Sequence, residues 1–107
     1  MNTPLADNSQ WIIAADSTAP ALEVILARQT VILSWKQFVY AEGADDEIRI
    51  AFASHDVIVR GSGLSPLLRA IAGHQVLSIR EPASGDRFSA PAAGCIREIE
   101  VRRVHAD

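Results

Sequence analysis

The sequence predicts an α+β domain that is mainly β: a bent antiparallel sheet or partial barrel with one short helix at about residues 65–73. Three features of the chain indicate this class. Several short stretches alternate apolar and polar residues, which is the two-residue period of half-buried strands. Short polar turns join most of these stretches, and tight turns favour antiparallel pairing. One stretch carries helix signals instead, and that helix is expected to cover one face or one opening of the sheet.

The first strands are expected between residues 22 and 60. Apolar residues alternate over residues 22–26 and again over 31–35, and the short polar break between them predicts a hairpin. Three further alternating stretches follow over residues 38–60. Polar turns, one of which contains Gly43, separate them, so this region predicts a three-stranded meander.

The helix signals begin at Ser65. Its hydroxyl can accept a hydrogen bond from an unpaired amide of the first turn, so Ser65 is the expected N-cap. Pro66 fits the first helical position, where no amide donor is needed, and Gly73 is a suitable stop. A helix of about two turns is unstable alone, so it must pack on the sheet. Its apolar stripe is formed by Leu67, Leu68 and Ile71.

Two more strands are expected after the helix. The first spans residues 75–81, with Leu77 and Ile79 on one face. Residues 82–93 form the longest loop, and long loops are often mobile or functional. The last strand runs from about Cys95 to Val104, and its alternating Arg and Glu residues predict cross-strand ion pairs.

The length of 107 residues leaves room for one hydrophobic core. We expect residues 1–20 to be a loosely ordered N-terminal segment and residues 21–107 to be a single α+β domain. The apolar patch Trp11-Ile12-Ile13 leaves an alternative open, in which it forms a short edge strand or an arm that docks on a partner.

Composition excludes several classes of protein. A single cysteine, Cys95, cannot form an internal disulfide, which excludes a secreted disulfide scaffold and favours a reducing, cytoplasmic compartment. The three histidines lack the spacing of zinc ligands, so no metal site is expected. No apolar run approaches the roughly 20 residues that span a bilayer, so no membrane association is expected.

The net charge of −3 is uneven along the chain. Residues 1–46 carry two basic and six acidic groups, and residues 47–107 carry eight basic and seven acidic groups. Neither half has the basic surplus that is typical of nucleic-acid binding. The aromatic residues Trp11, Trp35, Phe38 and Tyr40 lie in the acidic half, so core packing is preferred over a nucleic-acid stacking platform.

The segment from Phe52 to Glu81 combines three short motifs: Phe-x-Ser-His before a strand, Arg-Gly-x-Gly-Leu before a Pro-led helix, and His-x-Val before a strand that ends in Ile-Arg-Glu. In these features it resembles a segment of small bacterial proteins of unknown function. The resemblance covers about 30 residues. It implies a bacterial origin and the strand–helix–strand order, and it assigns no catalytic residue.

One candidate ligand site precedes the helix. Free amides at a helix start, the partial positive charge there and nearby arginines could hold a phosphate or carboxylate. The alternative is a glycine turn followed by an ordinary cap. The motif is neither a P-loop nor a dinucleotide fingerprint, because the Lys and the third Gly are missing. The residues of this candidate anion site are Arg60, Gly61, Ser62, Gly63, Ser65 and Arg69.

Other reactive residue types have simpler interpretations. Ser54, His55 and Asp56 are consecutive, so they cannot line up as a catalytic triad and are expected to form a turn. The carboxylates at residues 45–47 are expected to be a solvated turn. Cys95 has no local histidine signature and is expected to be a half-buried strand residue. We therefore predict no catalytic residue and no cofactor.

Three functions follow from these expectations. The first is a non-enzymatic protein-interaction module that self-associates as a homodimer or binds a protein partner through a strand edge, with the last strand and the Trp11 segment as the expected edges. The second is a small-anion-binding domain that uses residues 60–65. The third is a weak nucleic-acid-binding small barrel, which the acidity of the chain disfavours.

Overall fold

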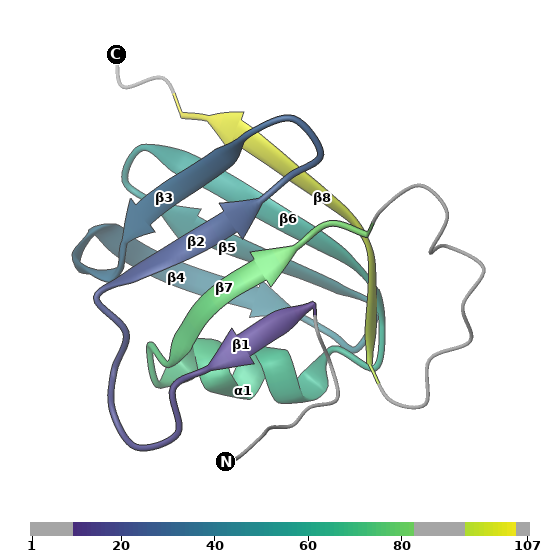
Figure 1. Cartoon of the computed structure of the whole chain (residues 1–107), viewed down its shortest axis with the longest axis horizontal. Coiled ribbons are helices and arrows are strands. Elements are labelled where there is room, and N and C mark those ends of the chain that lie inside the picture. The colour runs from purple at the N-terminus through teal and green to yellow at the C-terminus, as the bar shows by residue number, and fades with distance from the viewer. Residues whose placement is uncertain (1–9, 83–93, 105–107) are drawn as a thin grey trace.

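A computed structural model describes residues 10–82 and 94–104 of the chain. These residues form two four-stranded sheets, one α-helix and one 3-10 turn (Figure 1). The mainly β, α+β class is therefore confirmed, and the sheets do not close into a barrel. The elements are β1 (Trp11–Ile13), β2 (Ala21–Ile25), β3 (Thr30–Ser34), η1 (Trp35–Gln37), β4 (Phe38–Gly43), β5 (Glu47–Phe52), β6 (His55–Ser62), α1 (Ser65–Ala72), β7 (Val76–Arg80) and β8 (Cys95–Arg103).

The first sheet has the strand order β1-β7-β2-β3. The β2–β3 hairpin is antiparallel, as the sequence predicts, and β1 pairs antiparallel with β7. By contrast, β2 and β7 are parallel. A parallel pair needs a long crossover connection. Here the connection consists of β3, the 3-10 turn, β4 to β6 and α1.

The second sheet has the order β4-β5-β6-β8 and is antiparallel throughout. Its first three strands are the predicted meander, which is confirmed. Each sheet turns one apolar face toward the core. In β5 and β6, alternate residues are isoleucine or valine, and these side chains point into the core between the two sheets. Fully buried members of this core include Leu22, Val24, Ile48, Ile50, Val57, Val59, Ile79 and Ile96.

The predicted helix is confirmed as α1, which packs against β4 and β7 at one end of the two sheets (Figure 1). The expected N-cap is wrong, because Leu64 is the N-cap residue and makes no side-chain capping bond. Gly73 is the C-cap, but the left-handed backbone conformation falls on His74, with a φ of 54°. Few non-glycine residues adopt this conformation.

Two details of the first sheet differ from the expected pattern. Trp11–Ile13 lies inside the segment expected to be loosely ordered, yet it forms β1, so the edge-strand alternative is the one found. In β7, the register to β1 jumps from Ser78 to Val76, which leaves Leu77 as an extra, bulged residue. Leu77 and Ile79 therefore do not share a face: Ile79 is in the core and Leu77 is exposed.

The long loop expected at residues 82–93 lies almost entirely outside the described residues. Among the described residues, no helix has both the length and the apolar character needed to cross a membrane.

Candidate interaction surfaces

The start of α1 is held by a carboxylate from the β4–β5 turn. Asp45 accepts hydrogen bonds from the backbone N–H of Gly63 at 3.0 Å, from the N–H of Ser65 at 3.2 Å and from the Ser65 hydroxyl at 2.8 Å. Its backbone carbonyl also accepts from the N–H of Leu64 at 2.9 Å. The bonds from Ser65 dominate and hold the pKa of Asp45 below its usual value. Asp45 therefore acts as the anion at this helix end.

The helix-start donors of the candidate anion site are therefore already bonded to a group of the same chain. The Gly63 and Ser65 donors are engaged by Asp45, so an incoming anion would have to displace a carboxylate of the same chain. Arg60 lies on β6 and its guanidinium pairs with Glu98 at 3.2 Å and Glu100 at 3.4 Å. The remaining residues lie elsewhere: Ser62 is exposed at the end of β6, and Arg69 is in the last turn of α1. The structure thus does not bring the six predicted residues together around one space.

Gly61 has a packing role instead of a ligand-binding one. A Cβ atom at this position would lie 1.9 Å from the carbonyl oxygen of Cys95. That distance is far below any non-bonded contact, so β8 can approach β6 here only because residue 61 is glycine. The glycines before the helix are therefore required for backbone geometry: Gly61 allows the close approach of β8, and Gly63 adopts a positive φ.

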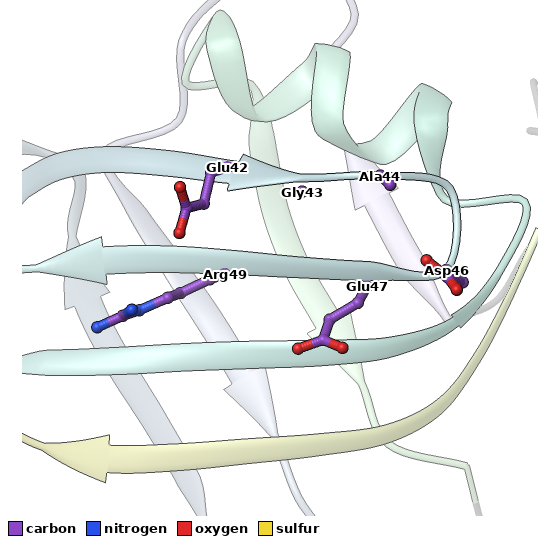
Figure 2. Close-up of a pocket in the computed structure, with 6 residues that line it drawn as sticks. All are labelled: Glu42, Gly43, Ala44, Asp46, Glu47 and Arg49. Atoms are coloured by element: carbon purple, nitrogen blue, oxygen red, sulfur yellow. The ribbon is translucent and has the colours of Figure 1, made fainter.

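A shallow surface hollow of about 610 Å³ lies at the β4–β5 turn. Figure 2 shows its side chains spread along the two strands and the turn, without a common centre toward which they point. Acid–base catalysis needs two groups that face one reacting atom in different environments. The hollow does not have that arrangement, which agrees with the expected polar turn. Its lining residues are Glu42, Gly43, Ala44, Asp46, Glu47 and Arg49.

The outer face of the second sheet carries ion pairs on β5, β6 and β8, which we call the charge grid. Arg49 contacts Asp56 at 2.8 Å, and Arg102 contacts Glu100 at 2.7 Å. Together with the two contacts of Arg60, these bonds link β5 to β6 and β6 to β8. The hydrogen bond from Arg102 is the main reason why the pKa of Glu100 is lowered. The cross-strand ion pairs predicted for β8 are thus confirmed by the contacts of Arg60 with Glu98 and Glu100.

The aromatic residues form a core cluster instead of an exposed platform. Trp35 is buried and donates its indole N–H to the carbonyl of Val76 at 3.0 Å. The ring of His74 stacks on Trp35, with centroids 5.0 Å apart and an angle of 11°. Phe38 and Phe52 complete the cluster edge-on or tilted. These contacts explain what holds His74 in its left-handed conformation.

The remaining reactive residues of the described part of the chain do not form a catalytic constellation. Ser54 Oγ lies 2.7 Å from His55 Nδ1, but Asp56 bonds to Arg49 and so does not orient this histidine. Cys95 is half-buried at the start of β8, and its thiol lies 3.7 Å from the carbonyl of Ile96. Within residues 10–82 and 94–104, no group of three His, Cys, Asp or Glu residues could hold a metal ion.

Four of the seven exposed large apolar residues of the described chain lie on the first sheet, while Val39 and Tyr40 lie on β4 and Val104 follows β8. Ile12 is 54 % exposed and Ile32 is 64 % exposed. The register aligns Ile12 with Ser78, Ser78 with Glu23, and Glu23 with Ile32, so the two isoleucines lie in one row, separated by the buried Ser78 and the charged Glu23. The bulged Leu77 and the neighbouring Ile13 add further exposed apolar area. We call Ile12, Ile13, Ile32 and Leu77 the apolar set of the first sheet.

Each sheet also ends in two edge strands, and three of these four edges carry features that block further pairing. β1 has three residues, and the Gln10 side chain bridges from it to β8 by two bonds to the backbone of Ile96, at 2.7 and 2.8 Å. β8 exposes charged side chains along its length. β4 is bulged at Val39 and has α1 packed beside it. Short length, charge, bulges and helix cover are the common protections of sheet edges.

Within the described residues, the fourth edge, β3, has none of these features. Its five residues are uncharged and contain no proline, and its pairing to β2 is regular along its whole length. The sequence-based choice of edges is therefore half right: the last strand and the Trp11 segment are edges, but both are protected. The overlooked edge lies in a stretch whose alternation looks like that of any central strand.

Comparison with protein-family models, with curated proteins and with solved structures gives no match to this chain. The resemblance of residues 52–81 to small bacterial proteins of unknown function therefore stays a prediction.

Proposed function

We propose that this chain is a non-enzymatic protein-interaction module that self-associates through its first sheet. The observation that carries the proposal is a difference between two edges. The first sheet exposes Ile12, Ile13, Ile32 and Leu77, and its edge strand β3 is uncharged and regularly paired. On the second sheet the exposed Val39 and Tyr40 lie on β4, which is bulged and has α1 packed beside it. Apolar surface of this kind is typical of association sites. A homodimer and a cytoplasmic location are parts of the same proposal.

The anion-binding alternative has less support. The helix-start donors that it would use are bonded to Asp45, and Arg60 is bonded to two glutamates. Nucleic-acid binding has less support again, because Trp35 is buried and the charges of the second sheet alternate in sign. For either alternative to hold, these internal bonds would have to be exchanged for ligand contacts.

Light-scattering mass coupled to size-exclusion chromatography tests the proposal. The chain is run over a series of concentrations from low micromolar to millimolar, at two salt levels. We expect the mass to rise from 11.6 kDa toward twice that value as the concentration increases. A mass that stays at 11.6 kDa over the whole series would rule out self-association.

A further inference from the structure

We propose that the self-association uses the edge of β3, which pairs antiparallel with β3 of a second copy so that Ile32 lies opposite the Ile32 of the partner. This inference rests on the proposed self-association and assigns it one surface, one symmetry and one register. It joins the two first sheets into a continuous sheet of eight strands, four from each copy.

The hydrogen-bond pattern of the hairpin shows which backbone groups of β3 point outward. Leu26 N–H donates to the carbonyl of Gln29 at 2.8 Å at the turn, and Trp35 N–H donates to the carbonyl of Pro20 at 3.2 Å at the other end. In an antiparallel ladder, residues that bond to the neighbouring strand alternate with residues that do not. Residues 29, 31, 33 and 35 therefore face β2. The N–H and C=O groups of Thr30, Ile32 and Ser34 face away from it.

Because the backbone groups of residues 30, 32 and 34 all face outward, the edge of β3 can pair with the same edge of a second copy. A two-fold axis at Ile32 pairs Ile32 with Ile32, and it pairs Thr30 with Ser34 in both directions. Every outward-facing backbone group of β3 then finds a partner, and an isologous contact of this kind closes at two copies. Shifting the two copies by two residues keeps the outward-facing residues paired with one another, but leaves some outward N–H and C=O groups of β3 without a partner on the other β3.

The side chains fit the same register. Ile32 is 64 % exposed at the centre of the strand, and the pairing would place it against a second isoleucine on the outer face. Within the strand, Thr30, Val31, Leu33 and Ser34 carry no charge, so no like charges oppose one another there. Arg28 and Lys36 lie just beyond the two ends, where their repulsion is exposed to solvent and screened by salt.

The expected strength is modest. An edge of five residues buries less area than the 1,200–2,000 Å² or so of standard stable interfaces, so the association should depend on concentration. This is why the test needs a wide concentration range, and why one charge at the centre should have a measurable effect.

The first experiment compares Ile32→Lys with Val39→Lys by light scattering and sedimentation equilibrium on the full chain. Val39 is a matched control, since it is β-branched, 61 % exposed and on β4, the bulged edge strand of the second sheet. We expect Ile32→Lys to weaken self-association by roughly tenfold or more, because two ammonium groups would meet at the axis. Val39→Lys should leave it unchanged. Circular dichroism melts show whether both variants fold like the parent.

The second experiment tests the register by oxidation. Cys95→Ser removes the native thiol, and Ile32→Cys is added to it. In this register the two copies of residue 32 form a hydrogen-bonded pair, whose Cα atoms lie about 5.5 Å apart, within the range of a disulfide. We expect a covalent dimer under mild oxidation. Thr30→Cys in the same background is the control, because the two copies of residue 30 would lie about 13 Å apart.

The outcomes separate this inference from the proposed function. If the parent chain dimerises but Ile32→Lys dimerises equally well, the β3 edge is wrong and self-association stands. If Ile12→Lys disrupts the dimer and Ile32→Lys does not, the outer face near β1 is the interface instead. If the parent is monomeric at every concentration, both proposals are wrong. A Thr30→Cys dimer that forms as fast as the Ile32→Cys dimer would overturn the register.

Discussion

The two sheets differ in the charged and apolar residues that they expose and in how their edges are protected. On the second sheet, Arg49 and Arg60 bond to carboxylates on neighbouring strands, Arg102 bonds to Glu100 on its own strand, and the two edges are charged or covered by α1. On the first sheet, the apolar set stays exposed and β3 ends the sheet with an unprotected edge. The comparison teaches that the second sheet pairs charged groups of β5, β6 and β8 with one another, although Val39 and Tyr40 of β4 stay exposed. The first sheet instead exposes the apolar set and the outward backbone groups of β3, and we propose that a second copy covers this edge.

The largest effect is expected where the second sheet is packed most tightly. Gly61→Val places a side chain onto the carbonyl of Cys95, so β8 must separate from β6. We expect a loss of at least about 3 kcal/mol of unfolding free energy, measured by urea denaturation. The control is Gly73→Ala, whose Cβ would meet only the flexible side chain of Gln75 and should cost far less. Equal losses for the two variants would contradict the close-approach explanation.

The next effect concerns the turn that joins the second sheet to the helix. Asp45→Asn removes the charged acceptor from Gly63 and Ser65, and we expect the melting temperature to fall by a few degrees at pH 7. The folded-state pKa of Asp45 is lowered, so its contribution is present above the unfolded pKa and is lost as pH falls through the folded pKa.

The difference in melting temperature between parent and Asp45→Asn should therefore shrink in acid, below about pH 4. Asp46→Asn serves as the control and should melt like the parent at pH 7, since it keeps the backbone carbonyl of residue 46 that accepts from the N–H of Gly61 at 3.0 Å. A difference that does not change with pH would argue against a charge effect.

The smallest stability effect is expected on the charge grid. Glu100→Gln removes the carboxylate that bonds to Arg60 and Arg102, but exposed ion pairs contribute little. We expect a change in melting temperature of no more than about one or two degrees, and one that decreases further in high salt. A large loss of stability would mean that the second sheet depends on its outer face as much as on its core.

The salt dependence of the dimer tests the β3 edge of the first sheet. If β3 pairs with itself, Arg28 and Lys36 of the two copies approach each other at the ends of the strand, and added salt should strengthen the dimer slightly. Sedimentation equilibrium at 50 and 500 mM NaCl measures this change. Strong weakening by salt would indicate that oppositely charged groups carry the interface.

Much of the fold could be predicted because local patterns determine it. The alternation in β5 and β6 and the Pro66 signal of α1 are read within a few residues of sequence. The parallel pairing of β7 with β2 could not be read this way, because it depends on which of several similar strands meet after 50 residues of intervening chain. The bulge at Leu77 was missed for the same reason, since only the partner strand reveals an extra residue.

The candidate site shows the same limit more clearly. Glycines before a helix predicted an anion site, and an anion does lie there, but it is the carboxylate of Asp45, which sits 20 residues earlier in the sequence. Nothing in the polar turn at residues 45–47 distinguishes Asp45 from Asp46. The same holds for β3, since its sequence alone does not tell whether one or both of its edges are paired.

The position of β7 between β1 and β2 also constrains the order of assembly. During synthesis the β2–β3 hairpin emerges long before residues 76–80, so one edge of β2 waits without a partner until the second sheet and α1 have been made. Pairings over such sequence separations are slow to form, because the loop must close before its contacts contribute. A nascent chain that stalls before residue 76 therefore presents an apolar hairpin with both edges open, and we expect it to require chaperone protection at that stage.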